Sequence, residues 1–371
     1  MIDVKDIISY FESKNVNFFT GVPDSQLSSF CDYVEENCEN IIAANEGNAL
    51  AIATGYNLAT DKYPVVYLQN SGLGNIVNPV TSLTHKKVYS IPVIYVIGWR
   101  GEPGVHDEPQ HIKQGAITPN LLDLLDISYF NITKDTEFGD FKYTFENDFF
   151  EKLNYGESVA ILVSKESFMD YKIIKENDNL LTREQAIQTI VDYLTEEDIV
   201  ISTTGKSSRE LFEYRETLNQ GHGNDFLTVG SMGHSSSIAL GVALNTDKRV
   251  FCFDGDGALL MHMGAVALIG SKKPKNFYHV MFNNSAHESV GGLPTIMNMI
   301  EIEDLVVSCG YYKVYNARNH EELKEILPLF IKDNGPVFLN IDVDISSRKD
   351  LGRPSTTPNE NKNEFKKRLG L

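Results

Sequence analysis

The feature that most constrains the fold is an internal repeat half a chain apart. Residues 52–62 (IATGYNLATDK) match residues 238–248 (IALGVALNTDK) at seven of eleven positions, at an offset of 186 in a chain of 371 residues. In each copy a helical pattern ends in a polar turn that leads directly into a strand-like run. Such a repeat predicts two tandem copies of one α/β domain. Chance similarity between two helix–turn patterns is the alternative.

Both halves of the chain alternate short apolar runs with helical patterns. Strands that are apolar along almost their whole length are typical of parallel sheets covered by helices on both faces. We therefore predict an α/β fold with domains at 1–165 and 183–371 and a linker at 166–182. The polar tail from residue 346 either forms a docking arm or is frayed. The expected strands are 17–22, 41–45, 65–70, 93–98 and 159–164 in the first half, and 198–204, 226–229, 250–255, 277–283, 312–317 and 337–343 in the second.

The charge balance excludes two classes of partner. Lys and Arg number 33 against 51 Asp and Glu, a net charge of −18. Nucleic acids and anionic membranes need a basic surface, so neither is an expected partner. No apolar run reaches the length of about 18 residues that a bilayer span needs. The four cysteines lack the CxxC spacing of zinc sites. We expect a soluble, reduced, cytoplasmic protein.

A candidate metal–diphosphate site lies in residues 253–284. Asp256 leaves one strand, and Asn283 ends the next strand 27 residues later. The carboxyl ends of parallel strands share one edge of a sheet, so the two side chains can face one crevice, and their oxygens suit Mg²⁺. Gly255 and Gly257 allow close approach of a diphosphate, and a helix starting near Ala258 aims N–H groups at it. An ordinary Asp-Gly turn is the alternative.

GDG followed after about 27 residues by NN is the thiamin-diphosphate motif, and this segment resembles the diphosphate-binding domain of thiamin-diphosphate-dependent 2-oxo acid decarboxylases. The resemblance implies thiamin diphosphate and Mg²⁺ as cofactors, with Asp256, Asn283 and the backbone carbonyl of Ser285 as metal ligands. The first half resembles the pyrimidine-binding domain of that family. There Glu46, in IIAANEGNALA, stands at the position of the family's glutamate.

Five further segments resemble the phosphonopyruvate decarboxylase branch of this family, with sulfopyruvate decarboxylases as near neighbours. The resemblance implies a carbon–carbon lyase of phosphonate biosynthesis that converts 3-phosphonopyruvate to phosphonoacetaldehyde and CO₂. A sulfopyruvate substrate and a cofactor-binding, non-catalytic subunit are the alternatives. A generic nucleotide-binding protein is disfavoured because GxGxxG and Walker motifs are absent. The segments are 21–27, 69–83, 98–111, 202–211 and 230–241.

The resemblance also implies roles for residues around the cofactor. Glu46 is expected to hydrogen-bond the cofactor's pyrimidine ring and promote removal of its reactive proton; a glutamate that only complements a helix dipole is the alternative. Met232 is expected to support the bent cofactor as an apolar wedge, where an ordinary core methionine is the alternative. The carbonyl of Gly230 is the expected partner of the cofactor's 4′-amino group.

The group that handles the substrate's proton is left open. Asp24 and Ser25 precede Glu46 by 22 and 21 residues, and related decarboxylases place a substrate contact at the position of Ser25. Those relatives often carry a histidine past the third strand, where this chain has Gln69-Asn70. Histidines without a role are the alternative to a proton shuttle. The candidate histidines are His106, His111 and His287.

Substrate recognition needs local cations, because the acidic chain repels an anionic substrate at long range. Arg100, Lys113, Lys206 and Arg209 lie in or beside glycine-rich segments that follow strands, where solvated loop charges are the alternative. The turn-rich segment 98–115 is predicted to be a mobile lid. The resemblance further implies a homodimer or higher oligomer whose sites are shared between chains.

Overall fold

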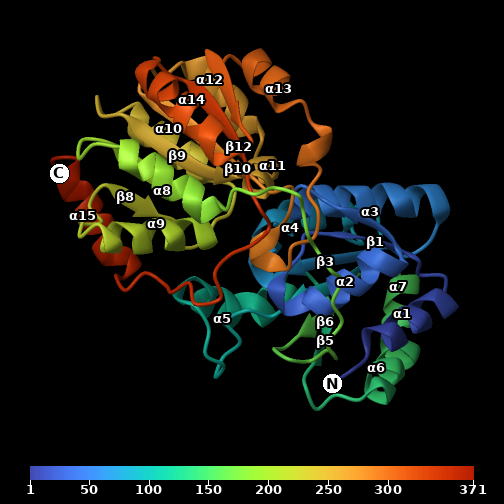
Figure 1. Ribbon diagram of the computed structural model, residues 1–371. Coiled ribbons are helices and arrows are strands. Elements are labelled where there is room, and N and C mark those ends of the chain that lie inside the picture. Colours follow the sequence, from blue (N-terminus) through green and yellow to red (C-terminus); the bar gives the residue numbers. More distant parts are fainter. The chain divides into compact units, whose positions relative to one another are not determined.

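The computed structural model describes all residues, 1–371, as two compact units (Figure 1). The N-terminal unit is Met1–Ile174, and the C-terminal unit is Lys175–Leu371. The boundary between them falls within residues 166–182. None of the helices has both the length and the apolar character that crossing a membrane requires.

The N-terminal unit is built on a six-stranded, all-parallel sheet of order β2-β1-β3-β4-β6-β5. Five strands fall where the sequence predicts them, although β2 begins two residues earlier than expected. The sequence did not predict β5, an edge strand whose residues are mostly only half-buried and which therefore lacks a continuous apolar run. The strands are β1 (Phe18–Gly21), β2 (Glu39–Ile42), β3 (Val65–Gln69), β4 (Ile94–Gly98), β5 (Ser128–Ile132) and β6 (Val159–Val163).

The C-terminal unit repeats this topology. Its six parallel strands have the order β8-β7-β9-β10-β12-β11, which is the order of the first sheet with each strand number raised by six. The prediction of two tandem copies of one α/β domain is therefore confirmed. The strands are β7 (Ile199–Ser202), β8 (Asp225–Leu227), β9 (Val250–Gly255), β10 (Phe277–Asn283), β11 (Lys313–Ala317) and β12 (Val337–Asp342).

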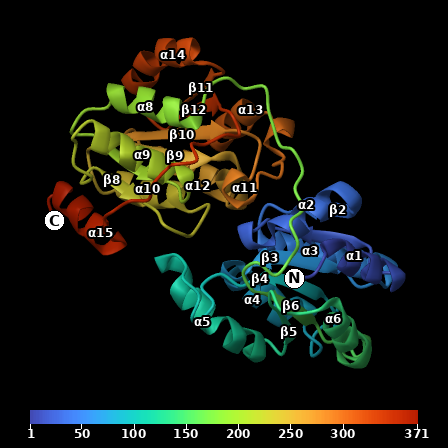
Figure 2. The same ribbon diagram turned by 60° about the horizontal axis from the view of Figure 1, so that its bottom comes forward.

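Helices cover both faces of each sheet (Figure 2). Those of the N-terminal unit are α1 (Val4–Ser13), α2 (Ser28–Asn37), α3 (Glu46–Thr60), α4 (Leu73–Pro79), α5 (Pro109–Leu124), α6 (Phe138–Thr144) and α7 (Phe150–Asn154). Those of the C-terminal unit are α8 (Arg183–Tyr193), α9 (Lys206–Thr217), α10 (Ser235–Ala243), α11 (Asp256–Met261), α12 (Gly264–Lys272), α13 (Ile302–Cys309), α14 (His320–Lys332) and α15 (Pro358–Arg368).

Strand β9 explains why its sheet needs helices on both sides. Phe251 and Phe253 pack into the apolar cluster formed with α8, α9 and α14. Val250 and Cys252, which point to the opposite face, pack into the cluster formed with α10, α12 and α13. Because successive side chains of a strand alternate between faces, a strand that is apolar throughout buries both faces and leaves only its ends for polar groups.

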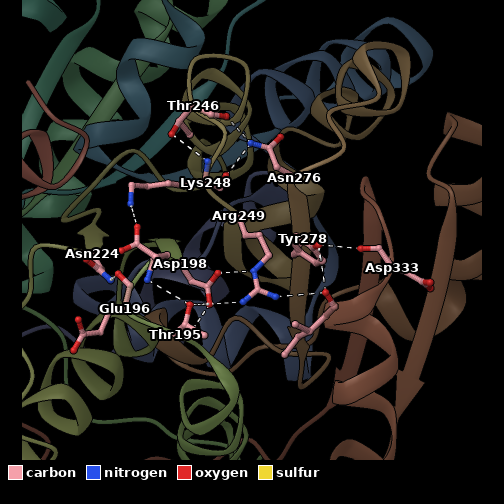
Figure 3. A network of polar contacts seen from close by, with 12 residues as sticks. Thr195, Glu196, Asp198, Asn224, Thr246, Lys248, Arg249, Asn276, Tyr278 and Asp333 are labelled. Carbon is pink, nitrogen blue, oxygen red and sulfur yellow. Dashed lines mark hydrogen bonds and ion pairs between the residues drawn. The ribbon is translucent and has the colours of Figure 1, made fainter.

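Polar side chains fix the amino ends of β7 and β9 (Figure 3). Arg249 donates to both carboxylate oxygens of Asp198, at 2.6 and 2.7 Å, and the Thr195 N–H donates to the same carboxylate. Asn276 donates to the carbonyls of Thr246 and Lys248. These groups bind one another at the edge opposite the strands' carboxyl ends, so they serve the fold.

The C-terminal tail docks on β8. The Asn361 side chain donates to the carbonyl of Asp225 at 2.8 Å and accepts from the N–H of Leu227 at 3.1 Å. It therefore pairs with the strand's outer edge as a further strand would, and Phe365 packs into the adjacent core. Of the two predicted alternatives for the tail, the docking arm is the one observed.

Candidate active site

Asp256 is the central acidic group at the carboxyl edge of the C-terminal sheet. It opens α11 directly after β9 and is 3% exposed. Thr295 Oγ1 donates to its Oδ2 at 2.5 Å. Burial raises the pKa of Asp256 to about 6, although hydrogen bonds from Thr295 and from the N–H of Gly257 oppose the rise. No basic side chain pairs with it, so a buried carboxylate faces this edge without a compensating cation.

A hairpin after β10 brings Thr295 to Asp256. Ser285 has a left-handed φ of +54°, its N–H donates to Asn283 Oδ1 at 3.1 Å, and its carbonyl accepts from the N–H of Thr295 at 2.9 Å. Gly291 and Gly292 form the turn with φ of +123° and +81°, values that suit glycine. The hairpin places Thr295 beside the carboxylate from which it is 39 residues distant in sequence.

A recess that is open to solvent lies at this edge. The Thr203 hydroxyl lines it and is buried without a hydrogen-bond partner. Beside it Gly205, with φ of +100°, leads into the first turn of α9, whose N–H groups favour anions. Seven predicted site residues line the recess: Lys206, Met232, Gly255, Asp256, Gly257, Ala258 and His287.

These groups fit a divalent cation and a diphosphate. Asp256 lines the recess, and Asn283 and Ser285 flank its lining residue Asn284. Their carboxylate, amide and backbone carbonyl oxygens are hard donors of the kind that Mg²⁺ prefers. The unpartnered hydroxyl of Thr203 and the start of α9 supply hydrogen-bond donors for phosphate oxygens. Met232 lies between Ser231 and Gly233, which have φ of +54° and +84°; left-handed backbone at a non-glycine residue is costly and is typical of functional sites.

Carboxylates neutralise the basic groups of the recess. Lys206 Nζ donates to Glu288 Oε1 at 2.8 Å, and Arg183 contacts the other oxygen of Glu288. Arg183 also donates to both oxygens of Glu210, at 2.7 and 2.8 Å. Burial alone would raise the pKa of Glu288, but Arg183 and Lys206 outweigh it and lower that pKa. Arg209 does not line the recess and binds the carbonyls of Leu351 and Gly352 in the tail.

The three predicted histidines lie in different surroundings. His287 lines the recess, is 8% exposed, and has its pKa lowered to about 4 by burial, so its imidazole is neutral near pH 7. His106 is exposed, in the loop between β4 and α5. His111 lies in the first turn of α5, where burial and then the charge of Arg100 lower its pKa. Lys113, further along the same helix, is exposed.

Glu46 lies at the carboxyl edge of the N-terminal sheet as the first residue of α3. The Asn45 side chain caps this helix by accepting from the N–H of Asn48. Glu46 is 5% exposed, and Asn75 Nδ2 donates to its Oε2 at 2.6 Å. A Cβ atom at Gly72 would lie 2.3 Å from Glu46 Oε1. The carboxyl group is therefore fixed by one amide and by backbone that only glycine allows to come so close.

Asp24 lies on the same edge and is completely buried. Gln69 Nε2 donates to its Oδ1 at 2.6 Å, and the N–H of Gln26 donates to its Oδ2 at 3.1 Å. Burial raises the pKa of Asp24, opposed by the Gln69 hydrogen bond and the charge of Arg100. Residues 69–72 connect the two carboxyl groups, since Gln69 contacts Asp24 and Gly72 packs against Glu46.

Arg100 holds Ser25 and is itself held by Asp107. Its Nε and Nη2 donate to the two oxygens of Asp107 at 2.8 and 2.6 Å, and its Nη1 donates to Ser25 Oγ at 3.0 Å. The N–H of Gly101 also donates to Asp107. Asn70 binds both the N–H and the carbonyl of Arg100. The turn that follows β4 is thereby closed by its own side chains; its mobility as a lid stays a prediction.

Sequence reasoning missed several groups at these two edges. The amides of Gln69 and Asn75 and the hydroxyl of Thr295 contact predicted site residues only because the chain returns from a distance. The unpartnered Thr203 could have been suspected, because it lies near the end of a predicted strand, two residues before a glycine. No local pattern distinguishes Thr295 from any other loop threonine.

Comparison with known protein families identifies the class. The model of the thiamine pyrophosphate enzyme N-terminal TPP binding domain matches residues 4–124. The model of the C-terminal TPP binding domain matches residues 203–341. The two tandem parallel α/β domains of this chain therefore have the fold of thiamine pyrophosphate enzymes. Glu46 lies at the carboxyl edge of one domain and Asp256 at that of the other.

Curated relatives narrow this class. Phosphonopyruvate decarboxylase from Streptomyces viridochromogenes is 32% identical, over 99% of this chain and 94% of its own. Sulfopyruvate decarboxylase from Methanosarcina acetivorans is 28% identical over 87% of each chain. The sulfopyruvate decarboxylase of Methanococcus maripaludis has separate subunits: beta is 34% identical over 42% of this chain and 80% of its own, and alpha 34% over 31% and 68%. The chain belongs to this family of thiamine-pyrophosphate-dependent decarboxylases, which are carbon–carbon lyases.

Proposed function

We propose that the protein decarboxylates 3-phosphonopyruvate to phosphonoacetaldehyde and CO₂, with thiamin diphosphate and Mg²⁺ as cofactors. The observation that carries the proposal is the 32% identity to a phosphonopyruvate decarboxylase along 99% of the chain, in a protein that retains both Glu46 and the Asp256–Asn283 pair. A cofactor-binding subunit without activity would have no use for Glu46. The aldehyde product retains its carbon–phosphorus bond, which suits phosphonate biosynthesis. We expect the enzyme to act in the cytoplasm.

The two domains would hold opposite ends of the cofactor. We assign pyrimidine binding to residues 1–165 and diphosphate binding to residues 183–371, joined by the linker at 166–182. Mg²⁺ would be held by Asp256, Asn283 and the carbonyl of Ser285. Met232 would contact the middle of the cofactor, and the Gly230 carbonyl its amino group. When bound, thiamin diphosphate supplies a carbon nucleophile that accepts the electrons left by departing CO₂.

The chain's own groups manage protons and charge. Glu46 would hold a proton at the pyrimidine ring nitrogen, a task for which it is fixed by Asn75 and Gly72. In the overall reaction one carbon–carbon bond breaks, and one proton replaces the lost carboxylate on the same carbon. Asp24, Ser25, His106, His111 and His287 are the candidates that the sequence offers for delivering it. Of these, His287 lines the recess and Ser25 contacts Arg100.

The charge near Ser25 bears on the choice of substrate. Asp107 compensates the charge of Arg100, and Lys206 and Arg209 already have partners. Lys113 is exposed. A phosphonate carries one negative charge more than a sulfonate and needs more free cation. The compensated state of Arg100 is therefore the observation that favours sulfopyruvate as a second candidate, along with the sulfopyruvate decarboxylases among the relatives.

The test is CO₂ release from phosphonopyruvate, sulfopyruvate and pyruvate, measured side by side with Mg²⁺ and thiamin diphosphate supplied. The proposal expects the highest kcat/KM for phosphonopyruvate. A higher value for sulfopyruvate would select the second candidate. Release from none of the three, by protein that retains its cofactor, would contradict the proposed function.

A further inference from the structure

The hydrogen bond between Gln69 and Asp24 joins a partly exposed group to a fully buried one. Asp24 has no exposed surface, whereas Gln69, the last residue of β3, is partly exposed at the carboxyl edge. A Cβ atom at Gly98 would lie 2.1 Å from Asp24 Oδ2, so the backbone of β4 closes over this carboxyl group. In this arrangement Asp24 does not face the edge where a substrate would bind.

The surroundings of Gln69 fix the orientation of its amide. Its Nε2 donates to Asp24 Oδ1 at 2.6 Å, and its Oε1 accepts from the hydroxyl of Ser71 at 2.7 Å. A carboxylate only accepts hydrogen bonds, so the NH₂ end must face Asp24. An NH₂ group has two hydrogens and Asp24 takes one, which leaves the second N–H as a directed donor.

The hydrogen bonds and the charge around Asp24 favour its carboxylate form and oppose the rise of its pKa that burial causes. Arg100 is the one charged group that acts on it directly, and Arg100 is in turn bound by Asp107. The N–H of Gln26 supplies the remaining hydrogen bond. No other titratable side chain contacts Asp24.

We propose that Gln69 is a substrate-binding residue that donates a hydrogen bond to an anionic oxygen of the substrate, and that Asp24 is a positioning residue that acts only through Gln69. The contact rests on the proposed function, since it presumes a 2-oxo acid at this edge. It differs from the sequence-based expectation for Asp24, which gave that residue a direct part in the chemistry.

A double-mutant cycle tests this division of roles. Gln69→Met removes the donor at similar volume, and Asp24→Asn removes the charge that orients it. Each single variant should lower kcat/KM about tenfold, mainly through KM, which is the scale of one hydrogen bond to a charged group. The kcat/KM of the double variant should lie within about twofold of that of the less active single variant, because without Gln69 there is no donor for Asp24 to position.

Gln26→Met is the matched control. It removes an amide from the same turn, one that donates to the carbonyls of Trp99 and Val163, while its backbone N–H still reaches Asp24. We expect little change in KM from it. If the loss of kcat/KM in the double variant equals the product of the two single losses, the proposal is overturned. A rise of KM in Gln26→Met as large as that in Gln69→Met would also overturn it. The cycle uses whichever of the three 2-oxo acids is turned over best, so a wrong substrate assignment leaves it interpretable.

Discussion

Thr295 Oγ1 lies 2.5 Å from Asp256 Oδ2 and donates a hydrogen bond to it. The hairpin between residues 285 and 295 brings Thr295 to Asp256, because the Ser285 carbonyl accepts a hydrogen bond from the N–H of Thr295. One segment therefore carries both the proposed carbonyl ligand, at Ser285, and a hydroxyl that orients the Asp256 carboxylate, which the sequence did not predict. If Asp256 holds the metal as proposed, Thr295 would act on that metal through Asp256.

Replacement of this hydroxyl should weaken metal-dependent cofactor binding. Groups that orient metal ligands typically contribute 10- to 100-fold to metal affinity, so we expect Thr295→Val to raise the dissociation constant of Mg²⁺–thiamin diphosphate about tenfold. Thr295→Ser keeps the hydroxyl and should stay near the wild-type value. Calorimetric titration of the cofactor into both variants measures this. Equal affinities for the Val and Ser variants would show that the hydroxyl is irrelevant.

Gly72 and Gly74 form a matched pair of glycines, of which only Gly72 packs against Glu46. A Cβ atom at Gly72 would lie 2.3 Å from Glu46 Oε1, whereas a Cβ atom at Gly74 has no neighbour within 4 Å. Gly72→Ala should displace the glutamate and lower kcat at least about tenfold, on the scale of lost acid–base assistance. Gly74→Ala should leave kcat unchanged and gain slightly in thermal stability, since it is within α4. Similar kcat values for the two variants would contradict the role of Glu46.

The fold was largely predictable because the central strands of both sheets are apolar along almost their whole length. The repeat at 52–62 and 238–248 indicated two domains, and the strand orders agree with it. The edge strand β5 was missed, because a half-buried strand does not need a continuous apolar run.

The site was less predictable than the fold. Asp256, Asn283 and Glu46 follow strands in recognisable motifs. The groups that bind them, Thr295 and Asn75, are brought near by loop geometry that leaves no mark in the local sequence.

The burial of Asp24 gives a pH dependence of stability. Its pKa in the folded protein is raised above the ordinary 3.8, so the stability it contributes is present below the unfolded pKa and is lost as the pH rises through the folded pKa. Asp24→Asn does not titrate. The Tm of Asp24→Asn relative to wild type should therefore increase between about pH 3.5 and pH 7. Thermal denaturation across this range checks it, and a constant or falling difference would argue against a raised pKa.

Sharing of sites between chains can be tested by mixing two inactive variants. Glu46→Gln damages the proposed pyrimidine-binding domain, and Asp256→Ala the diphosphate-binding domain. If each site combines domains from two chains, a mixed dimer contains one site with both lesions and one with neither, so activity should return after subunit exchange. Sites formed within single chains would each keep a lesion. Absence of recovery after exchange has been verified by mass would reject shared sites.

The most direct measurement follows phosphonopyruvate by ³¹P NMR with Mg²⁺ and thiamin diphosphate present. Wild-type protein should convert the substrate signal into that of phosphonoacetaldehyde, with one CO₂ released per aldehyde formed. Glu46→Gln should bind the cofactor within several-fold of wild type but react at least about 100-fold more slowly, the range expected for lost acid–base assistance. No aldehyde from cofactor-loaded wild type, or a Glu46→Gln variant within twofold of its rate, would contradict the account.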